Sequence, residues 1–97
     1  MNNIEKFIVP TTTHKDKKYI AILKDGQKVA FGNRNYQHFK DSVPVNLGGG
    51  KWSKLNHNDL KRRKSYRLRH AGVLTVDGKR AIDIKYSPAW FSYYYLW

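Results

Sequence analysis

Hydrophobic and polar residues alternate most clearly in two short runs near the start of the chain. Residues 19–23 and 28–31 are rich in β-branched and aromatic side chains, and the pair Asp25-Gly26 lies between them. Asp-Gly between two such runs is typical of a two-residue hairpin turn, because both central positions then need a positive φ. That turn places Ile22 opposite Val29. The buried face of the hairpin is then expected to contain Ile20, Ile22, Val29 and Phe31.

A similar pattern returns later in the chain. Residues 73–76 and 81–84 are again mostly apolar, and Asp77-Gly78 lies between them. The pattern predicts a second hairpin in which Val73 lies opposite Ile82. Its inner face is expected to contain Val73, Ile82 and Ile84.

A helix is predicted for residues 56–71, between the two hairpins. Asn56 can cap its start, and Asp59 lies in the first turn, where the helix dipole favours an anion. Gly72 can end the helix. The apolar stripe expected to anchor this helix to the sheet consists of Leu60, Leu68 and Ala71.

Six of the last ten residues are aromatic. Ser87 followed by Pro88 is typical of a helix start, so a short helix is expected here. Some of these rings can close the core, but six aromatics in ten positions cannot all face one small core. The others are expected at a protein interface or stacked on single-stranded bases. The candidate interface residues are Trp90, Phe91, Tyr93, Tyr94, Tyr95 and Trp97.

These elements together predict an α+β fold, with two β-hairpins packed on a basic α-helix and a short aromatic helix at the C-terminal end. Residues 1–18 are expected to form a polar N-terminal arm, whose apolar island at 7–9 can add a short strand to a sheet edge. Residues 19–97 are expected to form a single domain. The three glycines at 48–50 are predicted to be a hinge or a loop tip.

The net charge changes this picture from a generic small domain to a binding protein. Nineteen Lys and Arg against seven Asp and Glu give a formal charge of +12. Such an excess repels itself in a compact chain and is best tolerated beside an anionic partner. The chain has no cysteine, which excludes disulfides and thiolate metal sites. No apolar stretch is long enough to span a bilayer, so we expect an intracellular protein with no membrane span.

The basic residues are concentrated in the predicted helix. Six of the nine residues at 61–69 are Lys or Arg. This pattern favours a surface that binds a polyanion, with a merely solvated face or an acidic protein surface as the alternatives. No base-reading motif is present, so contact with the nucleic-acid backbone is expected. The candidate binding residues are Lys51, Lys54, Lys61, Arg62, Arg63, Tyr66, Arg67, Arg69 and His70.

Residues for catalysis or for a metal site are sparse. The four histidines, at 14, 38, 57 and 70, show no paired helical spacing of the kind that binds zinc. No nucleophile elbow or phosphate-binding glycine loop occurs either. We therefore expect no metal, no cofactor and no enzymatic activity, with a small histidine-dependent nuclease as the alternative.

Several of these residues also form a recognisable pattern. It includes Lys18-Tyr19-x-Ala21, Phe31-Gly32 with Tyr36, a closing Leu96-Trp97, and a His-x-Asp-x-x-Arg-Arg-x-x-Tyr-x-x-Arg-His frame. The residues that fit the frame are His57, Asp59, Arg62, Arg63, Tyr66, Arg69 and His70. Over about residues 18–97 this pattern resembles a family of short basic proteins of nucleocytoplasmic large DNA viruses, such as the algal-virus and mimivirus relatives.

The resemblance implies a place in a virus particle. The function expected from it is a non-enzymatic structural protein of the virion, a minor capsid or inner-shell component. Its partners would be capsid or other virion proteins and, without sequence specificity, nucleic acid. A free nucleic-acid-binding protein in the host cell is the main alternative.

Overall fold

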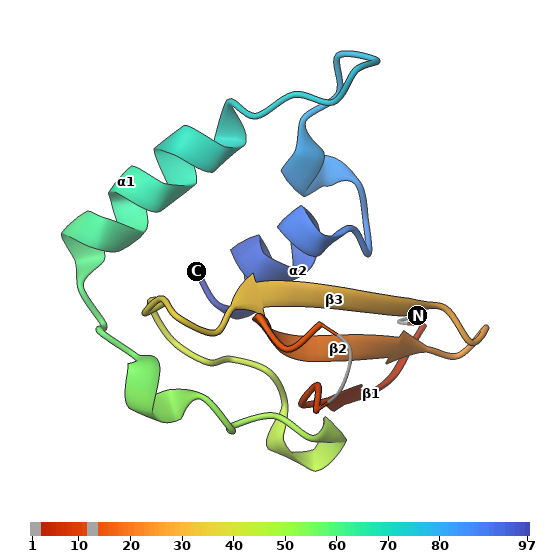
Figure 1. The fold of residues 1–97 in the computed structure, drawn as a ribbon. Coiled ribbons are helices and arrows are strands. Elements are labelled where there is room, and N and C mark those ends of the chain that lie inside the picture. Colours follow the sequence, from red (N-terminus) through yellow and green to blue (C-terminus); the bar gives the residue numbers. More distant parts are fainter. Residues whose placement is uncertain (1–2, 12–13) are drawn as a thin grey trace.

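The computed structural model describes residues 3–11 and 14–97. Within these residues it shows a mixed α+β fold, with a three-stranded antiparallel sheet in the order β1-β2-β3 and two α-helices (Figure 1). The strands are β1 (Ile4–Ile8), β2 (Lys17–Leu23) and β3 (Lys28–Asn33), and the helices are α1 (Leu60–Ala71) and α2 (Pro88–Tyr95). Three short 3-10 helices are η1 (Val45–Leu47), η2 (Ser53–Leu55) and η3 (Ala81–Asp83).

The turn between β2 and β3 is one residue longer than predicted. The Gly26 N–H donates to the Leu23 carbonyl, and the Leu23 N–H donates to the Gln27 carbonyl. Gly26 has a φ of 91°. This is the pattern of a three-residue loop, a type I turn closed by a glycine in the left-handed region.

The longer turn shifts the strand register. Val29 pairs with Ala21, where Ile22 was predicted. Since side chains alternate across a sheet, a shift of one residue exchanges the two faces of β2. Of the predicted β2 pair, Ile22 is only half-buried, while Ile20 is buried on the opposite face from Val29. The residues that form the buried face with Val29 and Phe31 are Tyr19, Ala21 and Leu23.

The segment 1–18 contributes a strand to the sheet, as its apolar island allowed. β1 pairs antiparallel with β2, and Ile4 and Phe7 lie in the core. The Phe7 ring makes edge contacts with Tyr19, Phe31 and Phe91, at centroid distances of 6.1, 6.1 and 6.0 Å. Residues 1, 2, 12 and 13 of the predicted arm lie outside the described residues.

Gly48 and Gly49 are packed tightly against neighbouring backbone and do not form a loop tip. A Cβ at Gly48 would lie 2.2 Å from the carbonyl oxygen of Phe7, and one at Gly49 would lie 2.0 Å from that of Val43. Gly49 is buried, and Val43 is part of the core. Glycine is therefore required at 48, where the long loop between β3 and α1 crosses close to β1, and at 49, where this loop folds back against Val43.

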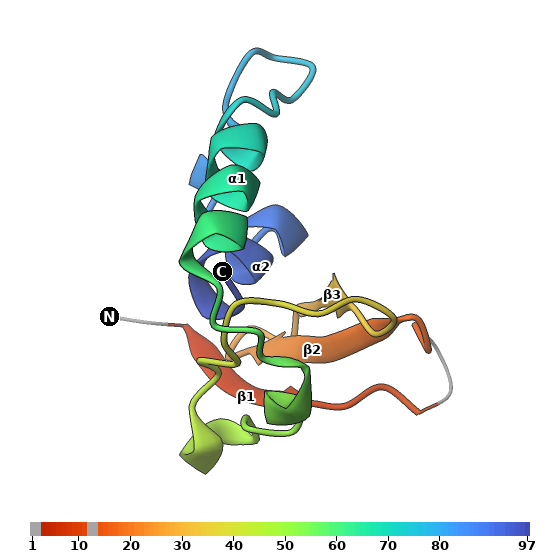
Figure 2. The ribbon, with the colours of Figure 1, turned by 90° about the vertical axis from the view of Figure 1, so that its left-hand side faces the viewer.

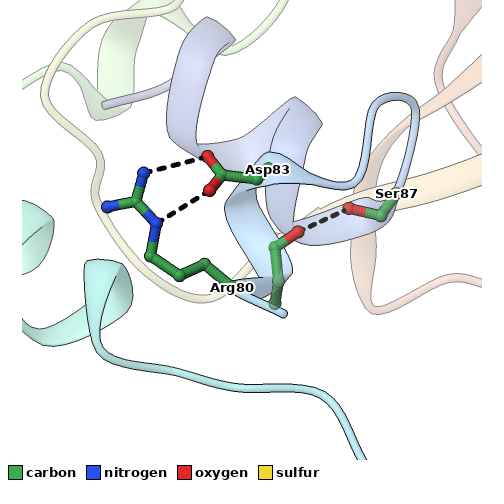
Figure 3. Close-up of polar contacts among 4 residues, drawn as sticks. Arg80, Asp83 and Ser87 are labelled. Atoms are coloured by element: carbon green, nitrogen blue, oxygen red, sulfur yellow. Dashed lines mark hydrogen bonds and ion pairs between the residues drawn. The ribbon is translucent and has the colours of Figure 1, made fainter. Parts of the chain in front are cut away.

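The predicted second hairpin is reduced to a turn with a single bridge. Leu74 pairs with Arg80, in place of the expected pairing of Val73 with Ile82. The chain then turns into η3, where the Arg80 guanidinium donates to the Asp83 carboxylate at 2.8 and 3.2 Å (Figure 3). The Ser87 hydroxyl donates to the carbonyl of Ala81 at 3.1 Å. Within η3 the backbone N–H groups of Asp83 and Ile84 donate to the carbonyls of Arg80 and Ala81, so these groups are satisfied locally and not by a strand pair.

α2 begins where the sequence predicted and covers the sheet. Ser87 caps it by accepting from the Trp90 N–H, and Pro88 is its first residue. Phe91 is fully buried and stacks on Phe31, with centroids 5.0 Å apart. The aromatic tail therefore closes the core through Phe91, and Tyr94 is its most exposed ring.

α1 stands away from the sheet, with α2 between them (Figures 1 and 2). It begins later than predicted, because Asp59 is its N-cap and accepts from the backbone N–H groups of Lys61 and Arg62. The expected anchor stripe is wrong. Leu60 and Leu68 are 68% and 69% exposed.

Candidate functional site

Four cations of α1 lie on its exposed surface. Lys61, Arg62, Lys64 and Arg69 are all exposed. The helix contains no acidic residue between Leu60 and Ala71, and its capping Asp59 is already used by two backbone N–H groups. Lys51 and Lys54, in the loop before α1, are exposed as well. The positive charge of this surface is therefore not neutralised from within the helix.

Arg63 and Arg67 are engaged internally. The Arg63 Nε donates to the backbone carbonyl of Trp97 at 2.9 Å, and the Arg67 Nη2 donates to the same oxygen at 3.1 Å. The Arg63 guanidinium lies 4.6 Å from the ring centre of Phe39, and that of Arg67 lies 4.9 Å from Tyr93. These two predicted binding residues hold α1 in place through charge-assisted hydrogen bonds and cation–π contacts.

An aromatic stack completes the attachment of α1. The Tyr66 ring lies between Trp97 and His70, with centroid distances of 4.0 and 3.8 Å. Burial raises the pKa of Tyr66 to about 12. Burial lowers the pKa of His70, and the charge of Arg69 lowers it further. The imidazole of His70 is therefore favoured in its neutral form.

A pocket of about 400 Å³ lies beside this stack. Its walls come from the end of β3 and the loop after it, from α1, and from the end of α2. The lining residues that carry a positive charge are Lys18, Arg62 and Arg69. The others are Gly32, Asn33, Tyr36, Gln37, Tyr66, His70, Ser92, Leu96 and Trp97. No Asp or Glu is among them.

Lys18 was not predicted as a site residue, and it is the most deeply buried cation of the described residues. Its side chain is 2% exposed, and its Nζ donates to the carbonyl of Tyr36 at 2.7 Å and to Nδ1 of His38 at 2.8 Å. Burial lowers the pKa of Lys18 to about 8, against the opposing effect of Asp41. The residues next to Lys18 in the sequence do not indicate that it is buried or that it contacts His38.

His38 has a defined tautomer in this network. Its Nε2 lies 2.6 Å from Oδ1 of Asn56, which also accepts from the backbone N–H of Asp41 at 2.8 Å. That oxygen is an acceptor, so Nε2 carries the hydrogen and Nδ1 accepts from Lys18. Burial, and then the charge of Lys18, lower the pKa of His38 to about 4. Asn56, predicted as a helix cap, is in fact a partner of this buried pair.

Asp41 holds the loop between β3 and α1 through hydrogen bonds to its carboxylate. Its carboxylate accepts from the Tyr19 hydroxyl at 2.5 Å and from the backbone N–H groups of Val43 and Trp52. The Tyr19 hydroxyl in turn accepts from the Lys51 N–H at 3.0 Å. Burial and the bond to Asp41 raise the pKa of Tyr19. This clamp fixes the loop that carries Lys51 and Lys54.

Several residues of the sequence pattern line the pocket, and they come from separate segments of the chain. Gly32 lies in β3 and Tyr36 follows it, Arg62 and Tyr66 belong to α1, and Trp97 follows α2. A side chain at Gly32 would press on Lys18 and Leu96, because its Cβ would lie 3.2 Å from the Lys18 Cβ and 3.0 Å from the Leu96 Cδ1.

No family model, curated protein or solved structure matches this chain. The viral setting therefore stays a prediction from the motif. Among the described residues there is no group of three His, Asp or Glu that could hold a metal ion, and no helix that is long and apolar enough to cross a membrane.

Proposed function

We propose that the protein binds nucleic acid through the phosphate backbone, without reading sequence, and that the exposed cations of α1 make the contact. The proposal rests on the two different roles that the basic residues of α1 have. Arg63 and Arg67 hold α1 against Trp97, while Lys61 and Lys64 remain exposed. A fixed helix therefore presents its charges to solvent in a defined geometry, as backbone recognition requires.

Repulsion within α1 also supports an anionic partner. Lys61 and Lys64 lie one turn apart on the exposed surface of α1, and like charges at this spacing destabilise a helix. Phosphate groups along a nucleic acid would relieve this repulsion and release counterions.

We place this activity in a particle of a large DNA virus, where the protein would be a non-enzymatic minor capsid or inner-shell component. The sequence pattern around the pocket is the support for this setting. Mass spectrometry of purified particles should find the protein at a copy number comparable to that of other structural components. Its absence from particles would leave the alternative, a free nucleic-acid-binding protein.

An acidic capsid protein is a second candidate partner. The exposed Leu60 and Leu68 flank Lys64 on one side of α1, together with the partly buried Tyr93. Apolar side chains among cations are typical of a protein interface, since phosphate contacts alone do not need them. Nucleic acid remains the first proposal because the four exposed cations of α1 outnumber these two leucines.

The salt dependence of binding tests the main proposal. Affinity for duplex DNA, measured by fluorescence anisotropy at several salt concentrations, should fall steeply as salt rises. A Lys61→Gln/Lys64→Gln variant should bind more weakly and reduce the slope of log affinity against log salt by about 2. The matched control is Lys24→Gln/Lys28→Gln, which removes the same charge at the β2–β3 turn. Equal losses in both variants would assign binding to net charge and not to α1.

A further inference from the structure

The pocket beside the aromatic stack gathers cations that are distant in sequence. Lys18 comes from β2, and Arg62 and Arg69 lie about two turns apart on α1. No acidic side chain lines the pocket. Positive charges brought together around a cavity repel one another, so an anion in the cavity would stabilise this arrangement. The arrangement differs from the outer face of α1, where the cations point to open solvent.

Two of the three pocket cations, Arg62 and Lys18, are held by hydrogen bonds within the protein. Arg62 donates to Oε1 of Gln37 at 2.9 Å, and Lys18 is held by the carbonyl of Tyr36 and by His38. Asn33 and Ser92 add further hydrogen-bonding side chains. Groups that are already oriented lose little conformational freedom when a ligand binds, so they favour a specific site over a diffuse charged surface.

The size of the pocket selects among anions. A volume of about 400 Å³ is within the usual range of small-ligand sites and exceeds what inorganic phosphate alone would fill. Tyr36 lines the pocket and is 68% exposed, so its ring is open to a planar base. A duplex is too wide to enter, whereas a single nucleotide unit fits.

We propose that this pocket binds a nucleotide through its terminal phosphate monoester, with Arg62 and Arg69 on the phosphate, the buried Lys18 adding positive charge from the pocket wall, and Tyr36 against the base. The nucleotide can be free or at the end of a single strand. A phosphate monoester carries close to two negative charges near neutral pH, so it matches several cations better than a backbone diester does. The strand-end form rests on the proposed function, because it supposes that the protein meets nucleic acid.

The test compares two short oligothymidylates that differ only in a terminal phosphate. Fluorescence anisotropy should show roughly tenfold tighter binding of the phosphorylated strand to the full chain. Arg69→Gln should remove most of this preference, and so should Tyr36→Ala, which keeps all the cations. The matched control is Lys64→Gln, which lies on the other side of α1 and should keep the ratio while it weakens both strands.

A titration with thymidine monophosphate alone distinguishes a free nucleotide from the end of a strand as the ligand of the pocket. Tryptophan fluorescence of the protein reports the binding. Binding of the mononucleotide without a strand-end preference would assign the pocket to a free nucleotide. Equal binding of the two strands together with no response to the mononucleotide would overturn the pocket and leave the α1 surface intact. Failure of both strands to bind would overturn the proposed function, and the mononucleotide titration would still decide the pocket. An unchanged ratio in Arg69→Gln and in Tyr36→Ala would contradict the assignment of these residues.

Discussion

The phenol ring of Tyr66 lies flat on the indole of Trp97, with centroids 4.0 Å apart and planes within 4° of parallel. One ring belongs to α1 and the other follows α2, so the stack joins two elements that are separated by the whole segment 72–87. The carbonyl of the same Trp97 accepts from Arg63 and Arg67. Trp97 is thus the residue against which the basic helix is positioned.

Removal of this ring should loosen the helix. Trp97→Ala is expected to lower the free energy of unfolding by about 2 kcal/mol, since it loses the stack on Tyr66 and exposes apolar surface. Chemical denaturation followed by far-UV circular dichroism measures the change. Tyr94→Ala, which removes an exposed ring from α2, is the control and should change stability by less than about 0.5 kcal/mol. Equal effects would contradict the role of Trp97.

Internal and exposed cations of α1 should behave differently. Arg67→Ala is expected to cost about 1–2 kcal/mol of stability, because it breaks the hydrogen bond to the Trp97 carbonyl and the contact with Tyr93. Lys64→Ala should leave stability within about 0.5 kcal/mol of wild type. Thermal unfolding of the two variants side by side provides the measurement. A destabilised Lys64→Ala protein would show that the assignment of the two faces is wrong.

The clamp at Asp41 should be important for the loop before α1. Tyr19→Phe removes the hydroxyl that donates to Asp41 and accepts from the Lys51 N–H, so two buried groups lose a partner. We expect a loss of about 1–3 kcal/mol, measured by urea denaturation. Hydrogen exchange at the amides of Lys51 and Trp52 should accelerate at the same time. Unchanged exchange there would argue against the clamp, whatever the global stability.

Protonation of His38 should weaken the fold in mild acid. Its pKa is lowered from 6.5 to about 4, mainly by burial and further by the charge of Lys18. Between these two values the unfolded chain binds more protons than the folded one, so stability is fully present above pH 6.5 and is lost as the pH falls toward 4. The loss is expected to reach about 3 kcal/mol from this group.

Denaturation at a series of pH values checks this expectation. His57 and His70 also have lowered pKa values and add a slope of the same sign, so a His70→Gln variant is the comparison. Below pH 6.5 the free energy of unfolding should depend less steeply on pH in His38→Gln than in His70→Gln. This holds even if the His38→Gln protein is less stable at every pH. The same slope in both variants would show that His38 is not the main titrating group.

Local chemistry made several features predictable. Ser87-Pro88 starts α2, and the Asp-Gly pairs mark turns at both predicted positions, because caps and turns depend on residues that are adjacent in sequence. The hairpin register was predicted wrongly, since Asp25-Gly26 is compatible with loops of two or three residues and the choice exchanges the faces of β2. The strand at 81–84 was also wrong, because Arg80 and Asp83 favour a local turn.

The sequence by itself determined the basic character of α1, its central residues and the aromatic composition of the tail. These features depend only on residues that are close together in the sequence. Only the tertiary structure decided which side of α1 faces the protein. Arg63, Arg67 and Tyr66 reach Trp97, and this outweighs the burial of Leu60 and Leu68. The contact between Lys18 and His38 was likewise decided by the fold, since such pairings join residues whose separation along the chain gives no local signal.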